Sequence, residues 1–148
     1  MEEIKIVDLY TDGACEPNPG KGGWGAILIY KGVEKILSGY EEISTNNKME
    51  LTAVIKGLEA LNTPCIVNVY SDSAYVVNSY INNWIDTWIK NNWKTSTGKD
   101  VANVDLWQKL VSLCKIHKVK FIKVKGHSDN VNNQRCDDLA VAEIKKRG

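Results

Sequence analysis

The feature that most constrains the fold of this chain is a helical stretch, residues 45–61, that follows three β-rich runs. These runs are expected to form a meander, in which the first ends at Asp12, the second covers residues 24–30 and the third covers residues 33–43. A fourth β-rich run ends at Asp72. The helix provides the crossover that a parallel connection requires, so the fourth run is predicted to lie parallel to the first.

The rest of the chain continues the alternation of helices and strands. Its residue patterns predict helices over 73–90 and 101–114, a strand over 117–125 and a last helix over 133–146. The expected fold is therefore of the α/β class. It has a mixed five-stranded sheet, with three antiparallel strands followed by parallel strands, and helices on both faces.

The composition fits one globular domain that spans residues 1–148, because 43% of the residues are hydrophobic. The formal net charge is only +1, so nucleic-acid binding would need a local positive patch. The four cysteines show no C-x-x-C or zinc-type spacing, and reduced thiols in a cytoplasmic protein are the simplest explanation. No apolar run of membrane length and no secretory leader appear. We therefore expect a cytoplasmic protein without membrane contact and, by default, a monomer.

Four carboxylates on separate stretches of the chain lie at element boundaries or on the inward stripe of a predicted helix: Asp12, Glu50, Asp72 and Asp137. Acidic side chains are costly in such places unless something positive is bound. A divalent metal site is the simplest resolution, and two metals about 3.5–4 Å apart are the usual arrangement for phosphodiester displacement. Metal-dependent phosphodiester chemistry is therefore the leading hypothesis.

Asp12 and Asp72 each end a β-rich run, and ligands gather outside the carboxyl ends of strands in open α/β sheets. Gly13 is expected to stop the first strand directly after Asp12. The two acids could therefore converge. Taken singly, a turn-forming role for Asp12 and a helix-capping role for Asp72 fit the sequence equally well.

Glu50 and Asp137 are harder to explain as surface residues. Glu50 lies one turn before Val54, on the packed stripe of its helix, where an ordinary solvated glutamate is not expected. Asp137 shares a stripe with Ala140 near the start of the last helix. Its neighbour Asp138 has the ordinary role of an acid close to a helix N-terminus.

Four blocks of this sequence resemble the signature blocks of type 1 ribonuclease H, and a fifth is also similar to that family. The blocks cover residues 11–15, 46–51, 71–76, 126–137 and, for the fifth, 103–110. A single block such as Thr-Asp-Gly would be weak support. Five blocks in the family's order, spread over nearly the whole chain, predict a ribonuclease H-like fold.

The resemblance implies an endoribonuclease that hydrolyses the RNA strand of RNA–DNA hybrids. Nothing in the sequence suggests an interface, so no obligate protein partner is expected. Asp12, Glu50, Asp72 and Asp137 would hold two Mg²⁺ ions, with Mn²⁺ as the alternative. One metal would orient and activate the attacking water and the other would stabilise the departing 3′ oxygen, leaving 5′-phosphate and 3′-hydroxyl ends. Hard dications prefer oxygen ligands, which agrees with this assignment. Crowded carboxylates should also raise one another's pKa values in the metal-free site.

His127 lies in a polar stretch that is expected to form a loop before the last helix. The resemblance implies a catalytic but auxiliary role for it, in proton transfer or product departure, rather than metal ligation. An exposed loop histidine without a task is the alternative. The other histidine, His117, is interpreted as an ordinary strand-edge residue.

Recognition of a hybrid depends on the 2′-hydroxyl, which distinguishes RNA from DNA. Short polar groups beside the acids suit this task, and by family analogy one of them contacts a phosphate. They are Cys15, Asn18, Asn46 and Asn47, with Thr45 near the phosphate. Turn and capping chemistry would explain the same residues.

Residues 80–99 resemble the handle with which family enzymes grip the DNA strand. Trp84 and Trp88 would lie against sugars, and Lys90 and Lys94 near phosphates. The alternative is that the two tryptophans, four residues apart, simply face the core on one side of a helix.

Two other functional classes use similar features. A non-catalytic hybrid-binding module would lose an acid, whereas all four are present here. A related nuclease or integrase-like transferase also uses acidic metal sites. The asparagine block at 46–47, the handle and the loop at 126–127 favour the ribonuclease.

Overall fold

A computed structural model describes residues 4–124 and 130–147 of the chain. Strands and helices follow one another along these residues in the order that the sequence predicts. The strands are β1 (Lys5–Glu16), β2 (Gly20–Tyr30), β3 (Val33–Ser44), β4 (Cys65–Ser71) and β5 (Lys118–Lys123). The helices are α1 (Asn46–Glu59), α2 (Ala74–Ile81), α3 (Trp84–Lys90), α4 (Val104–Ile116) and α5 (Val131–Arg147).

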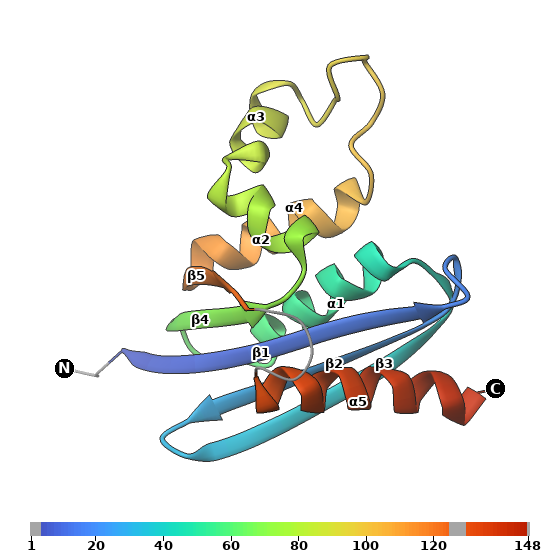
Figure 1. Cartoon of the computed structure of the whole chain (residues 1–148). Coiled ribbons are helices and arrows are strands. Elements are labelled where there is room, and N and C mark those ends of the chain that lie inside the picture. The colour runs from blue at the N-terminus through green and yellow to red at the C-terminus, as the bar shows by residue number, and fades with distance from the viewer. Residues whose placement is uncertain (1–3, 125–129, 148) are drawn as a thin grey trace.

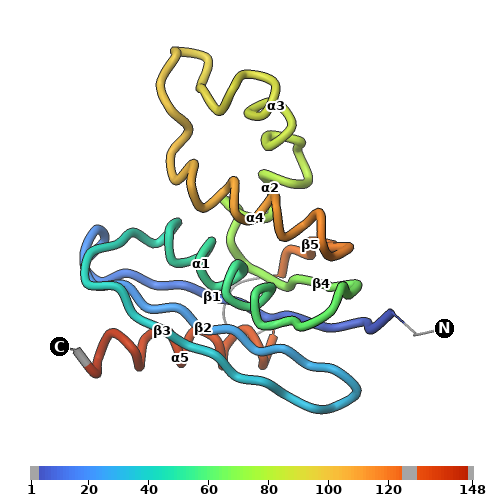
Figure 2. The backbone as a smooth tube through the Cα atoms, turned by 180° about the vertical axis from the view of Figure 1, so that it is seen from behind, coloured from blue at the N-terminus to red at the C-terminus, as the bar shows by residue number. Residues whose placement is uncertain are grey.

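The strands form one sheet in the order β3-β2-β1-β4-β5. The pairs β1–β2 and β2–β3 are antiparallel, and the pairs β1–β4 and β4–β5 are parallel. Helix α1 covers one face, and α5 packs on the opposite face (Figure 1; Figure 2 shows the same layers from behind). The predicted α/β fold, with a mixed sheet between helices, is confirmed.

The core lies between the sheet and the helices α1, α2 and α4, and β1 contributes to it through alternate, buried side chains. Val7 and Leu9 are buried on the α1 face of the strand. Gly57 allows the close approach of the helix, since a Cβ there would lie 2.6 Å from a methyl carbon of Leu9. On the other face, a Cβ on Gly25 would lie 2.6 Å from the carbonyl oxygen of Cys136. A glycine in β2 therefore lets α5, which carries Asp137, lie directly on the sheet.

The prediction that Gly13 stops the first strand is wrong. Strand β1 continues through Asp12 and Gly13 to Glu16, still paired with β2. Only the parallel pairing with β4 ends early, at Tyr10 and Tyr70. An extended glycine is tolerated in a strand where another backbone approaches closely. Asp12 thus lies just beyond the point where β1 and β4 part, and not at the end of its strand.

Other predicted boundaries move by a few residues. The helix predicted over 73–90 is two helices, because Asn83 between them adopts a left-handed backbone conformation. Helix α5 begins at 131, since the side-chain oxygen of Asn130 accepts hydrogen bonds from the amides of Asn132 and Asn133 at 3.1 Å each.

His117 is not an ordinary strand-edge residue. It is only 5% exposed, and its Nδ1 accepts a hydrogen bond from the backbone amide of Cys65 at 3.1 Å. Burial lowers the pKa of His117, so the neutral ring joins the end of α4 to the start of β4.

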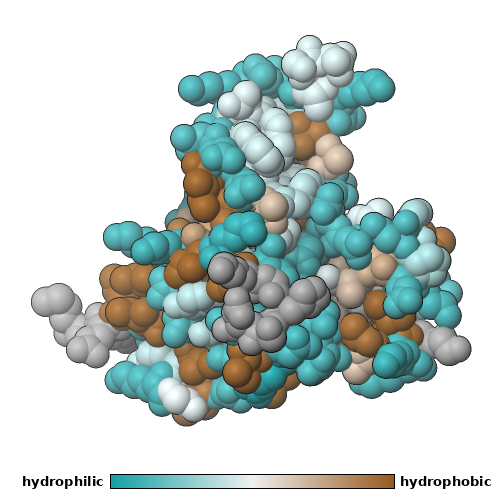
Figure 3. Space-filling view, in the orientation of Figure 1, coloured by the Kyte–Doolittle hydropathy of each residue, from teal (hydrophilic) through white to brown (hydrophobic). Residues whose placement is uncertain are grey.

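Residues 81–103, called the projection below, stand away from the sheet (Figures 1 and 2). They comprise the last residue of α2, helix α3 and the long connection to α4. In the space-filling view its surface is mostly hydrophilic or intermediate in hydropathy, with few hydrophobic side chains (Figure 3). Across the described part of the chain, the helices are too short or too polar to cross a membrane.

Candidate functional site

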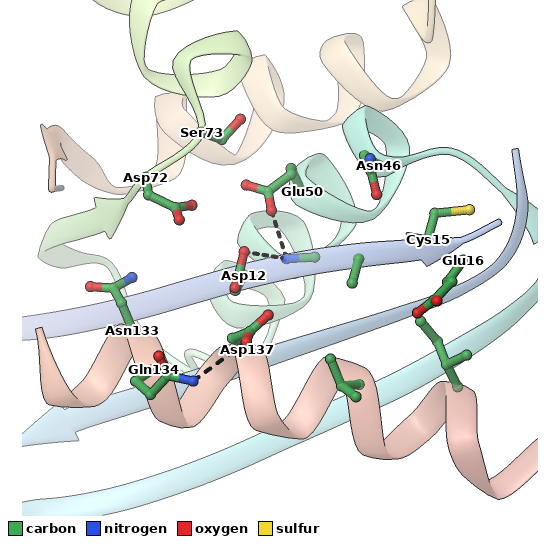
Figure 4. A pocket seen from close by; sticks show the side chains of 14 residues that line it. Asp12, Cys15, Glu16, Asn46, Glu50, Asp72, Ser73, Asn133, Gln134 and Asp137 are labelled. Atoms are coloured by element: carbon green, nitrogen blue, oxygen red, sulfur yellow. Dashed lines mark hydrogen bonds between the residues drawn. The ribbon is translucent and has the colours of Figure 1, made fainter. Parts of the chain in front are cut away.

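A cleft of about 430 Å³ opens beyond the point where β1 and β4 part (Figure 4). Its lining residues come from β1, α1, the β4–α2 connection and α5. They are Asp12, Gly13, Ala14, Cys15, Glu16, Asn46, Glu50, Asp72, Ser73, Asn133, Gln134, Asp137, Val141 and Ile144. All four carboxylates that the sequence singles out therefore border one cleft.

Three of these acids form a tight cluster. One carboxylate oxygen each from Asp12, Glu50 and Asp72 lies within 4.8 Å of the other two. Asp137 faces the cluster from α5, and its Oδ2 accepts a hydrogen bond from Nε2 of Gln134 at 3.4 Å (Figure 4). Three elements distant in sequence thus bring negative charge to one point, and a fourth adds an acid beside them.

Glu50 is held against β1 by the backbone amide of Gly13. This amide donates to Oε1 of Glu50 at 2.7 Å and to Oδ1 of Asp12 at 2.9 Å, so one N–H group orients two carboxylates. A Cβ on Gly13 would collide with the backbone of Met49 and Glu50. Glycine at this position is therefore what allows α1 to bring its acid to the strand.

Burial changes the acidity of Asp12 and Glu50. It raises the pKa of Asp12 to about 6; the hydrogen bond with Glu50 opposes this rise and the charge of Asp72 adds to it. The pKa of Glu50 lies well above its usual range, first because of burial and then because of Asp12. The sequence argument predicts the direction correctly but names crowding as the cause, whereas burial is the larger cause.

The cluster fits a hard divalent cation. Glu50 is only 8% exposed, and its Oε2 has no hydrogen-bond partner among the described residues. The described residues that line the cleft include no lysine or arginine that could neutralise the acids. Ions like Mg²⁺ prefer carboxylate oxygens as ligands. The cluster offers several of them, one buried and without a hydrogen-bond partner, and no cationic side chain of the described lining competes for them.

A second cleft, of about 490 Å³, lies beside the first. Asn46 lines both clefts, and the second one extends towards the base of the projection. Uncharged polar side chains dominate its lining, which consists of Asn18, Pro19, Thr45, Asn46, Asn47, Tyr75, Ala102 and Asn103. Four of the residues that the sequence proposes for substrate binding therefore share this surface.

Several of these polar groups also have structural roles. The side chain of Thr45 accepts a hydrogen bond from the Lys48 amide at 3.2 Å and caps α1. Oδ1 of Asn18 accepts one from the amide of Asn46, also at 3.2 Å. The thiol of Cys15 is buried and donates to a backbone carbonyl, so it is already used within the protein. Turn and capping chemistry operates here, as the alternative interpretation predicts.

The tryptophans of the expected handle differ in their surroundings. Trp84 is 43% exposed on α3, whereas Trp88 packs against Trp93 and Trp107, with ring centroids 6.3 and 5.3 Å apart. Lys90 is exposed at the end of α3. Lys94 forms an ion pair with Asp100 inside the projection. Trp84 and Lys90 are thus more available to a ligand than Trp88 and Lys94.

His127 lies outside the described residues. Asn133 belongs to the signature block at 126–137 but was assigned no role from the sequence, although it lines the cleft and is 6% exposed. The available signal was its place one turn before Asp137, where an amide occupies the inward stripe of α5.

Comparisons with known proteins indicate the same family as the signature blocks. Residues 4–145 match the RNase H family. The chain is 59% identical over 143 residues to the ribonuclease H of Caldicellulosiruptor saccharolyticus, and the aligned residues cover 97% of this chain and 99% of the relative. It is also 59% identical over 143 residues to the ribonuclease H of Acetivibrio thermocellus, covering 97% of each chain.

Two solved structures share the fold. LC9-RNase H1, described as a type 1 RNase H with the type 2 active-site motif, matches with a TM-score of 0.87 and 28% identity, covering all of this chain and 76% of its own. LC11-RNase H1 in complex with an RNA/DNA hybrid matches with a TM-score of 0.73 and 23% identity, covering 95% of this chain and 98% of its own.

The fold and the carboxylate cleft define an enzyme of the ribonuclease H-like class. The chain belongs to the RNase H family, as its type 1 signature blocks predict.

Proposed function

We propose that this protein is an endoribonuclease that hydrolyses the RNA strand of RNA–DNA hybrids and leaves 5′-phosphate and 3′-hydroxyl ends. The observation that carries the proposal is the cluster of Asp12, Glu50 and Asp72, with a buried and unpartnered oxygen of Glu50, in a chain whose relatives are named ribonuclease H. The LC11-RNase H1 structure, which contains an RNA/DNA hybrid, supports the same substrate class.

Asp12, Glu50, Asp72 and Asp137 would hold two Mg²⁺ ions, with Mn²⁺ as the alternative. When bound, the ions supply Lewis-acid stabilisation of the charge that develops on the phosphate, and they lower the pKa of the attacking water. The protein contributes position: the Gly13 amide fixes Asp12 and Glu50, and α5 brings Asp137 to the opposite side. The role proposed for His127 is auxiliary: it would pass protons or assist product departure.

The two adjoining clefts suit a duplex. The RNA strand would lie over the carboxylates, with Asn46 at the boundary. The second cleft, with Asn18, Thr45 and Asn47, would contact the backbones and 2′-hydroxyls through uncharged groups. The projection, through Trp84 and Lys90, would extend this contact along the DNA strand. Cys15, Trp88 and Lys94 complete the proposed set of substrate contacts, and the interactions described above make theirs the smaller contributions.

We further propose that the chain acts as a single catalytic domain, as a monomer, in the cytoplasm. Cys15, Cys65, Cys114 and Cys136 are all free thiols, and three of them are buried. Unpaired cysteines are typical of a reducing compartment. Analytical ultracentrifugation of the purified protein, with and without hybrid, tests the monomer.

The activity is tested with a hybrid whose RNA strand is end-labelled, incubated with the protein in Mg²⁺ or EDTA. We expect internal cleavage of the RNA in Mg²⁺ only, and no cleavage of single-stranded RNA, duplex RNA or duplex DNA. The fragments should be extendable by a polymerase without phosphatase treatment, because their 3′ ends carry free hydroxyls. Fragments that end in a 2′,3′-cyclic phosphate would show that the RNA's own 2′-hydroxyl is the nucleophile, which contradicts the proposal.

A further inference from the structure

Asn133 joins β1 and β4 at the place where the backbone pairing of these strands ends. The parallel pairing runs up to Tyr10 and Tyr70. Just beyond it, Nδ2 of Asn133 donates to the carbonyl oxygen of Thr11 at 3.3 Å and to the carbonyl oxygen of Tyr70 at 3.1 Å. One side-chain amide thus adds a rung across two strands that are about to separate.

The chemistry of this contact requires an amide. A primary amide nitrogen carries two hydrogens, and here each hydrogen bonds to a different strand. Both acceptors are carbonyl oxygens, so only the orientation that presents Nδ2 to them gives hydrogen bonds. A carboxylate at position 133 would place acceptors against acceptors, and an apolar side chain would leave both contacts unmade.

The position of Asn133 links this contact to the carboxylate cleft. Thr11 directly precedes Asp12, and Tyr70 lies two residues before Asp72. Asn133 itself lies one turn before Asp137 on α5. It is 6% exposed and lines the cleft beside Asp72 (Figure 4). A single buried side chain therefore ties together the three elements that carry three of the four acids.

We propose that Asn133 is a positioning residue that sets the spacing of Asp12, Asp72 and Asp137, and so the affinity of the site for divalent cations, without touching metal or substrate. Small displacements of ligand oxygens weaken a metal site strongly, because the coordination distances of Mg²⁺ are narrow. In other metal sites, residues that contact the ligands but not the metal also have a strong effect on metal affinity. This inference rests on the proposed metal binding of the cleft.

The test is a titration of the substrate-free protein with Mg²⁺, in which the NMR chemical shifts of the cleft amides report binding. Asn133→Leu keeps the approximate shape and removes both donors. We expect its Mg²⁺ dissociation constant to rise about 10-fold to 100-fold, the range seen for outer-shell partners. In hybrid cleavage, kcat should fall by a similar factor at fixed Mg²⁺ and recover partly at higher Mg²⁺, while KM changes by less than about twofold.

Two controls separate positioning from general loss of stability. Asn132→Ala removes the neighbouring amide, whose Oδ1 accepts from Arg135 at 3.1 Å and which has no part in the rung. Its Mg²⁺ affinity should be unchanged. Leu110→Ala destabilises the distant core between α1 and α4, and this variant too should bind Mg²⁺ normally while folded. Should Asn133→Leu fail to fold, Asn133→Ser retains one donor in a smaller side chain and should give a smaller rise.

The outcomes are distinct. Unchanged Mg²⁺ affinity in a folded Asn133→Leu or Asn133→Ser variant would overturn the inference, as would an equal loss of affinity in Leu110→Ala. If the wild-type protein binds Mg²⁺ but cleaves no hybrid, the proposed activity fails, whereas a weaker affinity in Asn133→Leu still supports the positioning role.

Discussion

The carboxylate cleft and the projection are built in opposite ways. The cleft is assembled from β1, α1, the end of β4 and α5, so its residues meet across long stretches of sequence. The projection combines contacts between residues close in sequence, such as the ion pair between Lys94 and Asp100, with an anchor of Ile85 and Val101 in the hydrophobic core. It also contains left-handed backbone at Asn83, Trp93 and Asn103, which is typical of turns and irregular connections.

The difference follows from what each region has to do. Metal-dependent chemistry requires oxygens in fixed positions, and a sheet packed between helices provides them. Contact with a long duplex tolerates variation in position and can be supplied by a local, exposed segment. The charges agree with this division: the cleft concentrates acids, whereas in the projection Asp86 and Asp100 partly offset the lysines.

The largest expected effect comes from the cleft. Asp12→Asn should reduce kcat for hybrid cleavage by about three orders of magnitude or more, because it removes a charged ligand from the centre of the cluster. The fold and the affinity for hybrid should be nearly unchanged. Asp138→Asn changes an exposed acid of α5 that does not line the cleft, so it is the matched control and should keep full activity. Substantial cleavage by Asp12→Asn would refute the metal assignment.

The second effect concerns pH. Burial raises the pKa of Asp12 from 3.8 to about 6, so the folded state binds this proton more tightly than the unfolded state. The stability that the proton provides is complete below pH 4 and is lost as pH rises through 6. It amounts to about 3 kcal/mol at most. Denaturant unfolding of the metal-free wild type and of Asp12→Asn between pH 4 and 7 measures it as a difference.

Bound Mg²⁺ should restore the stability that is lost when Asp12 loses its proton. At pH 7 its addition should raise the free energy of unfolding of the wild type more than that of Asp12→Asn. A difference between the two proteins that does not change across this pH range would show that Asp12 ionises normally.

The two tryptophans sharpen the comparison within the projection. Trp88→Ala should lower the free energy of unfolding by about 2–4 kcal/mol, because its ring packs on Trp107 and Trp93. Trp84→Ala should leave stability nearly unchanged and raise KM for hybrid about fivefold or more, through the loss of stacking on an exposed ring. Thermal unfolding and steady-state kinetics separate the two effects. The reverse assignment of effects would show that the exposed ring is not the contact.

The smallest expected effect concerns the lysines. Lys90→Ala should weaken hybrid binding a few-fold at low salt. It should also reduce the slope of log K against log salt concentration by about one, because one phosphate contact is lost. Lys94→Ala should do less, because Asp100 already neutralises this lysine. Asp100→Asn should release it and strengthen binding. Fluorescence anisotropy over a range of salt concentrations measures all three. Equal effects of Lys90→Ala and Lys94→Ala would mean that the ion pair does not persist in solution.

The order of elements could be predicted from the sequence because periodicity is a local property. Alternation in the strands and the inward stripe of 45–61 report which face of each element is buried, and Glu50 stands out as an acid on that stripe. Boundaries were less accessible. The continuation of β1 past Gly13 depends on its pairing with β2 and on the approach of α1, and neither is visible in the residues around position 13.

The sequence by itself determined the class of sheet, the family and the four acids, since these depend on residue types and on short-range spacing. Only the tertiary structure decided that three of the acids share one point and that Trp84 and Trp88 face different surroundings. It also decided that burial, more than crowding, raises the pKa values of Asp12 and Glu50. It also revealed Asn133, whose two hydrogen-bond partners lie 122 and 63 residues away in the chain. The physical reason is that burial and proximity arise from packing between distant segments, which no local pattern encodes.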